Sequence, residues 1–488
     1  MPSTALSRRN FLSAAASLAA AGCRQPGSSP PQTTEKADYT LTIAVKPVEV
    51  ASNRILSTTT YNGQFPGPLL RLQEGVPVTV DIRNQTDTPE QLHWHGQFVS
   101  TDIDGAAEEG TPYIPPHGSR RITLVPQPSG YRFYHTHVRA GENLNAGQYT
   151  GQVGPVYIEP KSHPGNYDRE VFLTLKEFEP VLSRGGDMDM DFLSPAATLG
   201  ELKDSGEGAM KASLAKGMPK GFEVGYGSFT INGRMLGSGE PIRVKQGERV
   251  LFHVLNGSAT EIRSLALPGH SFTVVAMDGN PIPKPVTVPG LWLGTAERLS
   301  AVVEMNHPGV WILGDTADDD RQHGMGIVVE YAGRTGKPQW IAPPKFPWDY
   351  TQFGNSGATV PAPDQVLTMT FAKDNAALGG FNRWTIDGVA FSEEHMHPMF
   401  RVQKGKRYRL RMRNASDDIH PIHLHRHSFE LTKVAGRPTS GVRKDVVMVG
   451  GYQEMEVDFI AENPGLTLFH CHQQLHMDFG FMALFEYA

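Results

Sequence analysis

The sequence predicts an all-β protein made of three tandem Greek-key β-sandwich modules. Apolar and polar residues alternate over short stretches such as 78–82 and 250–254, a period of two that is typical of half-buried strands. Glycine and proline are frequent, with 51 and 37 of 488 residues, as expected where turns join many short strands. One sequence pattern also occurs three times along the chain, and each copy marks one module.

The repeated pattern begins with a turn dipeptide, continues to an arginine with a glycine four residues later, and ends at an asparagine. The copies run from Asn62-Gly63 through Arg71 to Asn84, from Asn232-Gly233 through Arg243 to Asn256, and from Asp387-Gly388 through Arg401 to Asn414. The arginine and the asparagine are 13 residues apart each time (84 − 71, 256 − 243 and 414 − 401). Copies roughly 160 to 170 residues apart indicate whole domains rather than small stacked repeats. We expect domains at 38–160, 161–340 and 341–488, with a methionine-containing insertion at 183–221.

Residues 1–37 predict an export signal and a linker. The stretch Ser7-Arg8-Arg9-Asn10-Phe11-Leu12 is a twin-arginine pattern, and the small apolar run after it ends at Gly22. That run is too short to span a bilayer, which needs about 20 residues, so we expect twin-arginine export to the periplasm and no transmembrane segment. Cys23 is either part of the cleavage region or the lipidated cysteine of an anchored lipoprotein. The net charge of −6 argues against nucleic acid as a partner.

The histidines gather in four pairs with one residue between the partners. The pairs are His93-Trp94-His95 and His135-Thr136-His137 in the first module, and His423-Leu424-His425 and His470-Cys471-His472 in the third. The second module has no such pair. Residues two apart on a strand point to the same face. The eight imidazoles therefore predict a multinuclear metal cluster where the first and third modules meet.

Cys471 predicts a second kind of metal site. The only other cysteine, Cys23, lies in the export segment, so no routine disulfide is expected. On a strand, Cys471 points away from the two histidines beside it. His420 is an odd number of residues before His423 and also points to the opposite face, although Pro421 weakens strict alternation.

His420, Cys471 and His476 can therefore converge on a separate site within the third module. Two histidines and a cysteine form the ligand set of blue-copper electron-transfer sites.

The segments HWHG, HTH, HPIHLH and HCHQQLH resemble the copper signatures of three-domain multicopper oxidases, the laccase family. The resemblance covers the whole mature chain, and it implies a cupredoxin-like fold for each module and four copper ions: one type 1, one type 2 and a type 3 pair. It makes His420, Cys471 and His476 the type 1 ligands, His93 and His423 the type 2 ligands, and His95, His135, His137, His425, His470 and His472 the type 3 ligands.

The same resemblance assigns an axial position at the type 1 site to Phe481. A methionine there is a weak fourth ligand, and a phenylalanine implies a higher reduction potential because no thioether stabilises the oxidised copper. Met482 is the next residue, and a one-residue shift would bring its sulfur to the site instead.

Three carboxylates are candidates for roles beside the metals. Asp104 follows HWHG and resembles the family's acidic residue near the type 2 copper, so it is a candidate proton relay, with a plain turn residue as the alternative. Asp478 follows His476 by two residues and is a weaker relay candidate. Asp445 is expected to orient a type 1 histidine or to cap a strand.

The resemblance implies a multicopper oxidase. A small-molecule reductant gives single electrons to the type 1 copper, these pass through Cys471 to His470 and His472, and the trinuclear cluster reduces dioxygen to water. The preferred interpretation is that the electron donors are phenols or other aromatic compounds. A periplasmic cuprous or other metal oxidase in copper tolerance is the alternative, favoured by the thioethers of Met188, Met190, Met210 and Met218. A copper-binding electron-transfer protein is disfavoured by the complete histidine set, and a nitrite reductase by the type 3 ligands. We expect a monomer.

The remaining histidines are predicted to be structural, with two reservations. His427 continues the spacing of His425 but exceeds the ligand count. His395-Met396-His397 either binds a further metal, lines a donor site, or is an ordinary loop. The histidines that belong to no such pair or motif are His117, His163, His253, His270, His307 and His323.

Overall fold

The computed structural model describes residues 36–161, 166–183, 221–357 and 359–488. Asp38–Ala488 forms one compact unit, and its described residues form six β-sheets, which confirms the all-β prediction. The twin-arginine pattern, Cys23, the four insertion methionines and His163 lie outside the described residues. Within the described part of the chain, no helix is both long and apolar enough to cross a membrane.

The first module has two four-stranded sheets. One has the order β2-β1-β4-β6, and the other β3-β8-β7-β5. The strands are β1 (Tyr39–Ala51), β2 (Arg54–Tyr61), β3 (Leu70–Gln73), β4 (Val78–Asn84), β5 (His93–His95), β6 (Ser119–Leu124), β7 (Gly130–His135) and β8 (Val153–Glu159), with 3-10 turns η1 (Ala107–Glu109) and η2 (Gly147–Tyr149).

The second module has a six-stranded sheet, β10-β9-β12-β17-β14-β15, and a five-stranded sheet, β11-β19-β18-β13-β16. The elements are β9 (Arg169–Ser183), β10 (Glu223–Ile231), β11 (Ile242–Val244), β12 (Arg249–Asn256), β13 (Arg263–Ala266), β14 (Phe272–Met277), β15 (Asn280–Val288), β16 (Leu291–Leu293), β17 (Arg298–Glu304), β18 (Val310–Asp315), α3 (Asp318–Gln322) and β19 (Gly326–Tyr331).

The third module follows the 3-10 turn η4 (Tyr350–Phe353). Its sheets are β21-β20-β23-β29-β25-β26, with β27 also on β25, and β22-β31-β30-β24-β28. The elements are β20 (Gln365–Leu378), β21 (Phe381–Ile386), β22 (Met399–Val402), β23 (Arg407–Asn414), β24 (His420–Leu424), β25 (Phe429–Val434), β26 (Arg437–Pro438), β27 (Arg443–Lys444), β28 (Val446–Val449), β29 (Glu454–Ile460), β30 (Thr467–Cys471), α4 (Gln474–Asp478) and β31 (Met482–Tyr487).

The repeated sequence pattern has one structural meaning in all three modules. Its closing asparagines, Asn84, Asn256 and Asn414, are buried at the ends of equivalent strands and donate to carbonyls of the following loop. Each asparagine also accepts a backbone N–H two residues later. These hydrogen bonds satisfy the turn where the chain leaves the strand.

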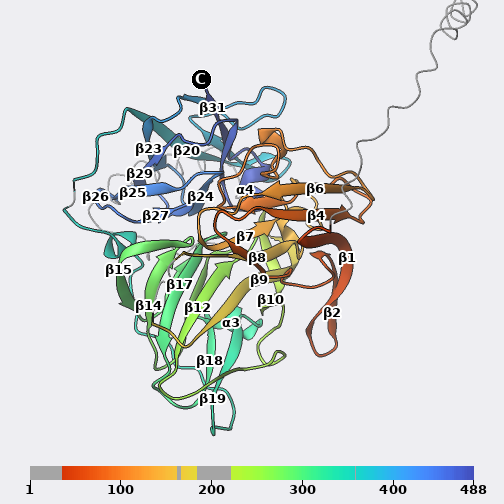
Figure 1. Cartoon of the computed structure of the whole chain (residues 1–488), viewed down its shortest axis with the longest axis vertical. Coiled ribbons are helices and arrows are strands. Elements are labelled where there is room, and N and C mark those ends of the chain that lie inside the picture. The colour runs from red at the N-terminus through yellow and green to blue at the C-terminus, as the bar shows by residue number, and fades with distance from the viewer. Residues whose placement is uncertain (1–35, 162–165, 184–220, 358) are drawn as a thin grey trace, which may run out of the picture. The chain divides into compact units, whose positions relative to one another are not determined.

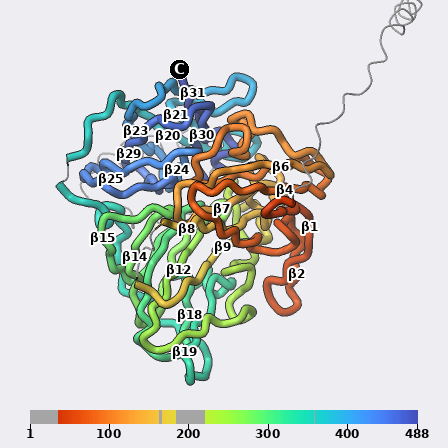
Figure 2. The backbone as a smooth tube through the Cα atoms, in the orientation of Figure 1, coloured from red at the N-terminus to blue at the C-terminus, as the bar shows by residue number. Residues whose placement is uncertain are grey.

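The third module lies beside the first, although they are the ends of the described chain. In Figure 1 the blue strand β24 lies near the orange strand β7, and the green strands of the second module lie against both modules. Strand β30 pairs with β24, and β5 pairs with β7. The tube in Figure 2 shows the chain passing through the second module and returning to the first. The predicted meeting of the first and third modules is the position of the histidines described next.

Candidate metal centres

Two pairs of neighbouring strands bring the eight paired histidines together. In the first module β5 pairs with β7, and His93 lies opposite His135. In the third module β24 pairs with β30, and His423 lies opposite His470. Of the second histidines, His95 lies on β5, whereas His137, His425 and His472 lie one or two residues beyond the ends of β7, β24 and β30. All eight side chains are buried, with at most 1% of any residue exposed.

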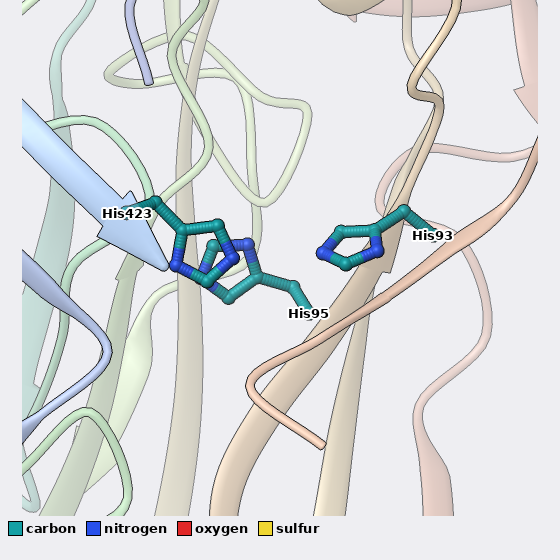
Figure 3. A group of neighbouring side chains, drawn as sticks. All are labelled: His93, His95 and His423. Carbon is teal, nitrogen blue, oxygen red and sulfur yellow. The ribbon is translucent and has the colours of Figure 1, made fainter. Parts of the chain in front are cut away.

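The histidines form three groups whose ligand nitrogens lie within 4.8 Å of one another. The groups are His93 with His95 and His423, His95 with His135 and His472, and His137 with His425 and His470. Every group takes members from both modules. Figure 3 shows the first group, in which the rings of His95 and His423 are stacked at 3.8 Å and His93 is directed towards them.

Hydrogen bonds determine which ring nitrogen faces the interior of the cluster. Nδ1 of five histidines faces an oxygen acceptor: His93 and the backbone of Asp104, His135 and Thr136, His423 and Asp445, His470 and Cys471, and His425 and the carboxylate of Asp104. A neutral imidazole that donates from Nδ1 has its lone pair on Nε2. His95 is reversed, because its Nε2 faces the Asp445 carboxylate and its Nδ1 faces the other histidines.

The protonation state and the unpaired nitrogens of these histidines indicate metal binding rather than packing in an apolar core. Burial lowers the pKa of seven of them, and to about 3 for His470. Neutral imidazoles are the form that binds metal. Nε2 of His93 and His423, and both nitrogens of His137 and His472, have no hydrogen-bond partner among the residues that the structure describes. Buried polar atoms without a partner are costly, and bound metal ions would satisfy them.

His420, Cys471 and His476 form a separate buried group. Nδ1 of His420 and Nδ1 of His476 are 3.1 Å apart, and they lie 3.7 and 3.5 Å from Sγ of Cys471. Burial raises the pKa of the Cys471 thiol and lowers that of both histidines. A soft cation that binds the thiolate would reverse the effect of burial on the thiol, and this ligand set favours copper.

The residue at the predicted axial position is Phe481, whose ring contacts that of His420 at a centroid distance of 4.7 Å. Met482 begins β31 and packs in a different apolar cluster, with Leu468 and Met477. Alternation along the strand accounts for the difference, because neighbouring residues face opposite sides.

Asp104 lies where the sequence predicts a carboxylate, beside the histidine cluster. Its Oδ2 is 3.1 Å from Nδ1 of His93 and 2.9 Å from Nδ1 of His425. Asp104 therefore contacts histidines from both modules.

The expected contact of Asp445 with a type 1 histidine is wrong. Its carboxylate lies 3.1 Å from Nε2 of His95, because β28, which follows Asp445, pairs with β24 in a register that aligns Val446 with His423. This places Asp445 at the cluster rather than at His420 or His476.

Asp478 joins two modules and, among the described residues, does not contact the paired histidines. Its Oδ2 accepts from the backbone N–H groups of Ala140 and Gly141, and Oδ1 accepts from Gln474. It thereby ties the segment after the HTH pair to α4. Burial raises its pKa to about 7.

Three charged residues near the cluster were not found from the sequence. Glu109 is 3.5 Å from Nδ1 of His425 and pairs with Arg426 at 2.9 Å; burial and the Asp104 charge raise its pKa well above the usual value. Arg132 and Arg298 contact Asp445. Only Glu109 could have been proposed from its position in the sequence, because it follows HWHG within the same module. Arg132 and Arg298 reach Asp445 across module boundaries.

The three further histidines that were candidate ligands, His395, His397 and His427, belong to neither centre. Nδ1 of His427 faces the carbonyl of His425 and Nε2 faces the Tyr487 hydroxyl. His395 and His397 are exposed. None of the three belongs to a candidate metal group in the described residues.

Comparisons with known proteins agree with this geometry. Three family models, each described as multicopper oxidase, match residues 42–163, 199–330 and 359–488. Multicopper oxidase MmcO of Mycobacterium tuberculosis is 30% identical, covering 92% of this chain and 87% of that protein. Laccase-4 of Thanatephorus cucumeris is 26% identical, over 84% and 82%.

Two further similarities differ in extent. Copper resistance protein A of Pseudomonas syringae pv. tomato is 29% identical over 55% of this chain but 46% of its own length. The crystal structure of the laccase from Botrytis aclada has a TM-score of 0.73 at 18% identity, covering 92% of this chain and 87% of that one, and it supports the fold. The chain therefore belongs to the multicopper oxidases, copper-dependent oxidoreductases that use dioxygen as electron acceptor.

Proposed function

We propose that this protein is a laccase-like oxidase that binds four copper ions and oxidises phenolic or aromatic donors one electron at a time. One observation carries the proposal. A buried two-histidine and cysteine group shares the segment His470-Cys471-His472 with a buried cluster of eight histidines. An isolated electron-transfer site needs only the first of these, whereas dioxygen reduction to water requires a place where several electrons are collected.

The ligand assignment follows the groups of nearby nitrogens. We assign His420, Cys471 and His476 to type 1 copper. His93 and His423 would bind type 2 copper. The type 3 pair would be held by two triads, His95 with His135 and His472, and His137 with His425 and His470. Bound copper would supply the redox chemistry, accepting single electrons from the donor and delivering four to dioxygen.

The remaining residues position these ligands and handle protons. Asp104 holds His425 in one orientation and places its carboxylate beside the cluster, next to Glu109, which supports its role as proton relay. Phe481 fills the axial position without offering a donor atom, which supports a high reduction potential and thus phenolic donors.

Oxygen consumption by the copper-loaded protein tests the function. We expect uptake with a phenol such as 2,6-dimethoxyphenol, with one dioxygen consumed for every four phenols oxidised and no hydrogen peroxide released. Copper measured on the same sample should be four per chain. Absence of uptake with phenols, aromatic amines and Cu(I) alike would exclude oxidase activity.

Cuprous oxidation is the second candidate, favoured by the similarity to copper resistance protein A. Its natural role would be copper tolerance. To test it, the protein and Cu(I) are mixed without oxygen, oxygen is then added, and its uptake is followed. Uptake that is much faster with Cu(I) than with any phenol would favour this function.

The location of the protein is proposed from its N-terminal sequence alone. The twin-arginine pattern at 7–12 supports export to the periplasm, and Cys23 is a candidate lipid anchor. Cell fractionation of the native chain and a Cys23→Ser variant separates a lipoprotein from a soluble monomer, since only an anchored form would move from membrane to soluble fraction on substitution.

A further inference from the structure

Asp445 contacts two stacked histidines that come from different modules. Its carboxylate oxygen Oδ1 lies 3.1 Å from Nε2 of His95, and its backbone carbonyl lies 2.7 Å from Nδ1 of His423. The two rings are 3.8 Å apart and nearly parallel, at 16°. One residue thus fixes the orientation of a histidine from β5 and of a histidine from β24.

The orientation of Asp445 is determined largely by the second module, which carries no paired histidines. Arg298, the first residue of β17, donates from both terminal nitrogens to the two carboxylate oxygens, at 2.7 and 2.6 Å. Two parallel N–H bonds fix a carboxylate in a plane. Asp278, also of the second module, accepts from the backbone N–H groups of Asp445 and Val446.

The group is fully buried and its charges balance. Arg132 of the first module lies 3.2 Å from Oδ2 of Asp445, and Lys444 lies 3.0 Å from Asp278 and 2.9 Å from Glu297. Three cations, Arg132, Arg298 and Lys444, face three carboxylates, Asp278, Glu297 and Asp445, and none is more than 1% exposed. Buried charges persist when each is paired and hydrogen-bonded, so the group has little freedom to rearrange.

We propose that the second module, which has no paired histidines, positions the metal cluster through Arg298. Arg298 orients Asp445, and Asp445 in turn keeps the proton of His95 on Nε2 and directs its Nδ1 into the cluster. Arg298 is thus a positioning residue, acting through Asp445. If Asp445 did not face His95, Nε2–H of His95 would have no acceptor, and either ring nitrogen could face the cluster. The proposal concerns the same site as the proposed function and rests on it for the identity of the metal.

The tautomer of His95 can be measured in the copper-free protein at neutral pH. Long-range ¹H–¹⁵N correlation of [¹⁵N]histidine-labelled protein distinguishes Nε2–H from Nδ1–H rings, and a His95→Gln variant assigns the signal. We expect Nε2–H for His95 and Nδ1–H for His93, His135, His423, His425 and His470. This outcome does not depend on oxidase activity, so its failure and the failure of the proposed function are distinguishable.

Two substitutions of Asp445 separate positioning from charge balance. Asp445→Asn keeps an oxygen that accepts from His95, whereas Asp445→Ala does not, and both leave the same excess positive charge. We expect Asn to preserve the Nε2–H tautomer and Ala to give a mixture of tautomers. Equal effects of the two substitutions on the tautomer would overturn the positioning role.

Arg298→Lys keeps the charge but not the paired N–H bonds. We expect a tautomer mixture and about 10- to 100-fold weaker retention of cluster copper against a chelator, with the blue absorption of the Cys471 site retained. A wild-type tautomer in this variant would overturn the role of Arg298.

Glu177→Gln is the matched control. It breaks another buried ion pair of the second module, with Arg263 at 2.6 Å, and in the described part of the chain this pair does not contact a paired histidine. It should leave the His95 tautomer and the cluster copper unchanged, and an equal effect would show general destabilisation and overturn the proposal.

Discussion

His470 faces the carbonyl oxygen of Cys471 with its Nδ1, at 2.8 Å. The same cysteine directs its sulfur to the other side, 3.5 Å from Nδ1 of His476. One residue therefore belongs to one candidate centre through its side chain and contacts the other through its backbone.

Replacement of that sulfur should separate the two centres. Cys471→Ser keeps the backbone and its contact with His470 but removes the soft ligand. We expect copper per chain to fall by one, the blue absorption to vanish and phenol oxidation to fall to background, while the type 2 electron paramagnetic resonance signal remains. Loss of all copper from a folded variant would contradict the separation.

Phe481 should be the residue that keeps the potential of the type 1 centre high. Phe481→Met introduces a thioether beside His420, which stabilises oxidised copper, so a redox titration should show a lower potential. Slower oxidation of phenols that are poor reductants should follow.

Met482→Leu is the control for this prediction. Met482 packs with Leu468 and Met477 on the opposite face, so its replacement should leave the potential unchanged. A fall in potential with neither variant, or a rise with Met482→Leu, would assign the axial position differently.

The sequence predicted those parts of the molecule that depend on local periodicity. The HxH spacing keeps the histidines in pairs on strands or at their ends, and the register of His93 with His135 and of His423 with His470 brings the pairs together. The repeated Asn84, Asn256 and Asn414 likewise close equivalent turns, because a strand end creates the same hydrogen-bonding need in each module.

What depends on module docking could not be predicted. Asp445 is 350 positions from His95, and no spacing rule relates them, so its partner was assigned wrongly. Arg298 lies in a module without a metal motif, and only the packed structure brings it to the cluster. The division of the proposed type 3 ligands into two triads has the same origin, because each triad draws on two modules.

Asp104 should matter for oxygen reduction but not for electron entry. Asp104→Asn keeps the shape and most hydrogen bonds but cannot carry a proton, so turnover with excess phenol should fall by about 10²- to 10⁴-fold. Anaerobic reduction of the blue centre by the phenol should be unchanged in stopped-flow measurements.

Asp478→Asn distinguishes the two candidate relays. Asp478 contacts Ala140, Gly141 and Gln474 rather than the cluster, so this variant should reduce oxygen at nearly the native rate. A large loss here, with none in Asp104→Asn, would reverse the assignment.

Glu170 should stabilise the protein above its usual pKa and lose that effect in acid. The contact between Nε2 of His253 and Oε1 of Glu170, at 3.5 Å, and then the hydrogen bond from Arg71 lower the pKa of Glu170 to about 2. A carboxyl whose pKa is lower in the folded state stabilises the fold above the unfolded value of about 4.3, and this contribution disappears as the pH falls through about 2.

Glu170→Gln should therefore cost about 1 kcal/mol at pH 6, allowing for screening of a partly exposed group, and only a small fraction of that near pH 2. Denaturant unfolding of the copper-free protein measures the difference. Glu240→Gln, at an exposed pair with Arg243, is the control and should show little effect at either pH. A penalty for Glu170→Gln that is constant with pH would contradict the argument.

Gly96, the last residue of HWHG, should tolerate no side chain because of Asp445 and Arg298. Its φ is +76°, and an added Cβ would lie 2.5 Å from Oδ2 of Asp445 and 2.9 Å from a terminal nitrogen of Arg298. Gly75 has nearly the same φ of +80° and nothing within 4 Å. Gly75→Ala should thus cost only the backbone strain, about 1–2 kcal/mol. Gly96→Ala should cost clearly more and also lose cluster copper, because the intruding methyl displaces the carboxylate that faces His95. Equal unfolding free energies and equal copper content in the two variants would show that backbone conformation alone, and not the buried carboxylate, requires glycine in this motif.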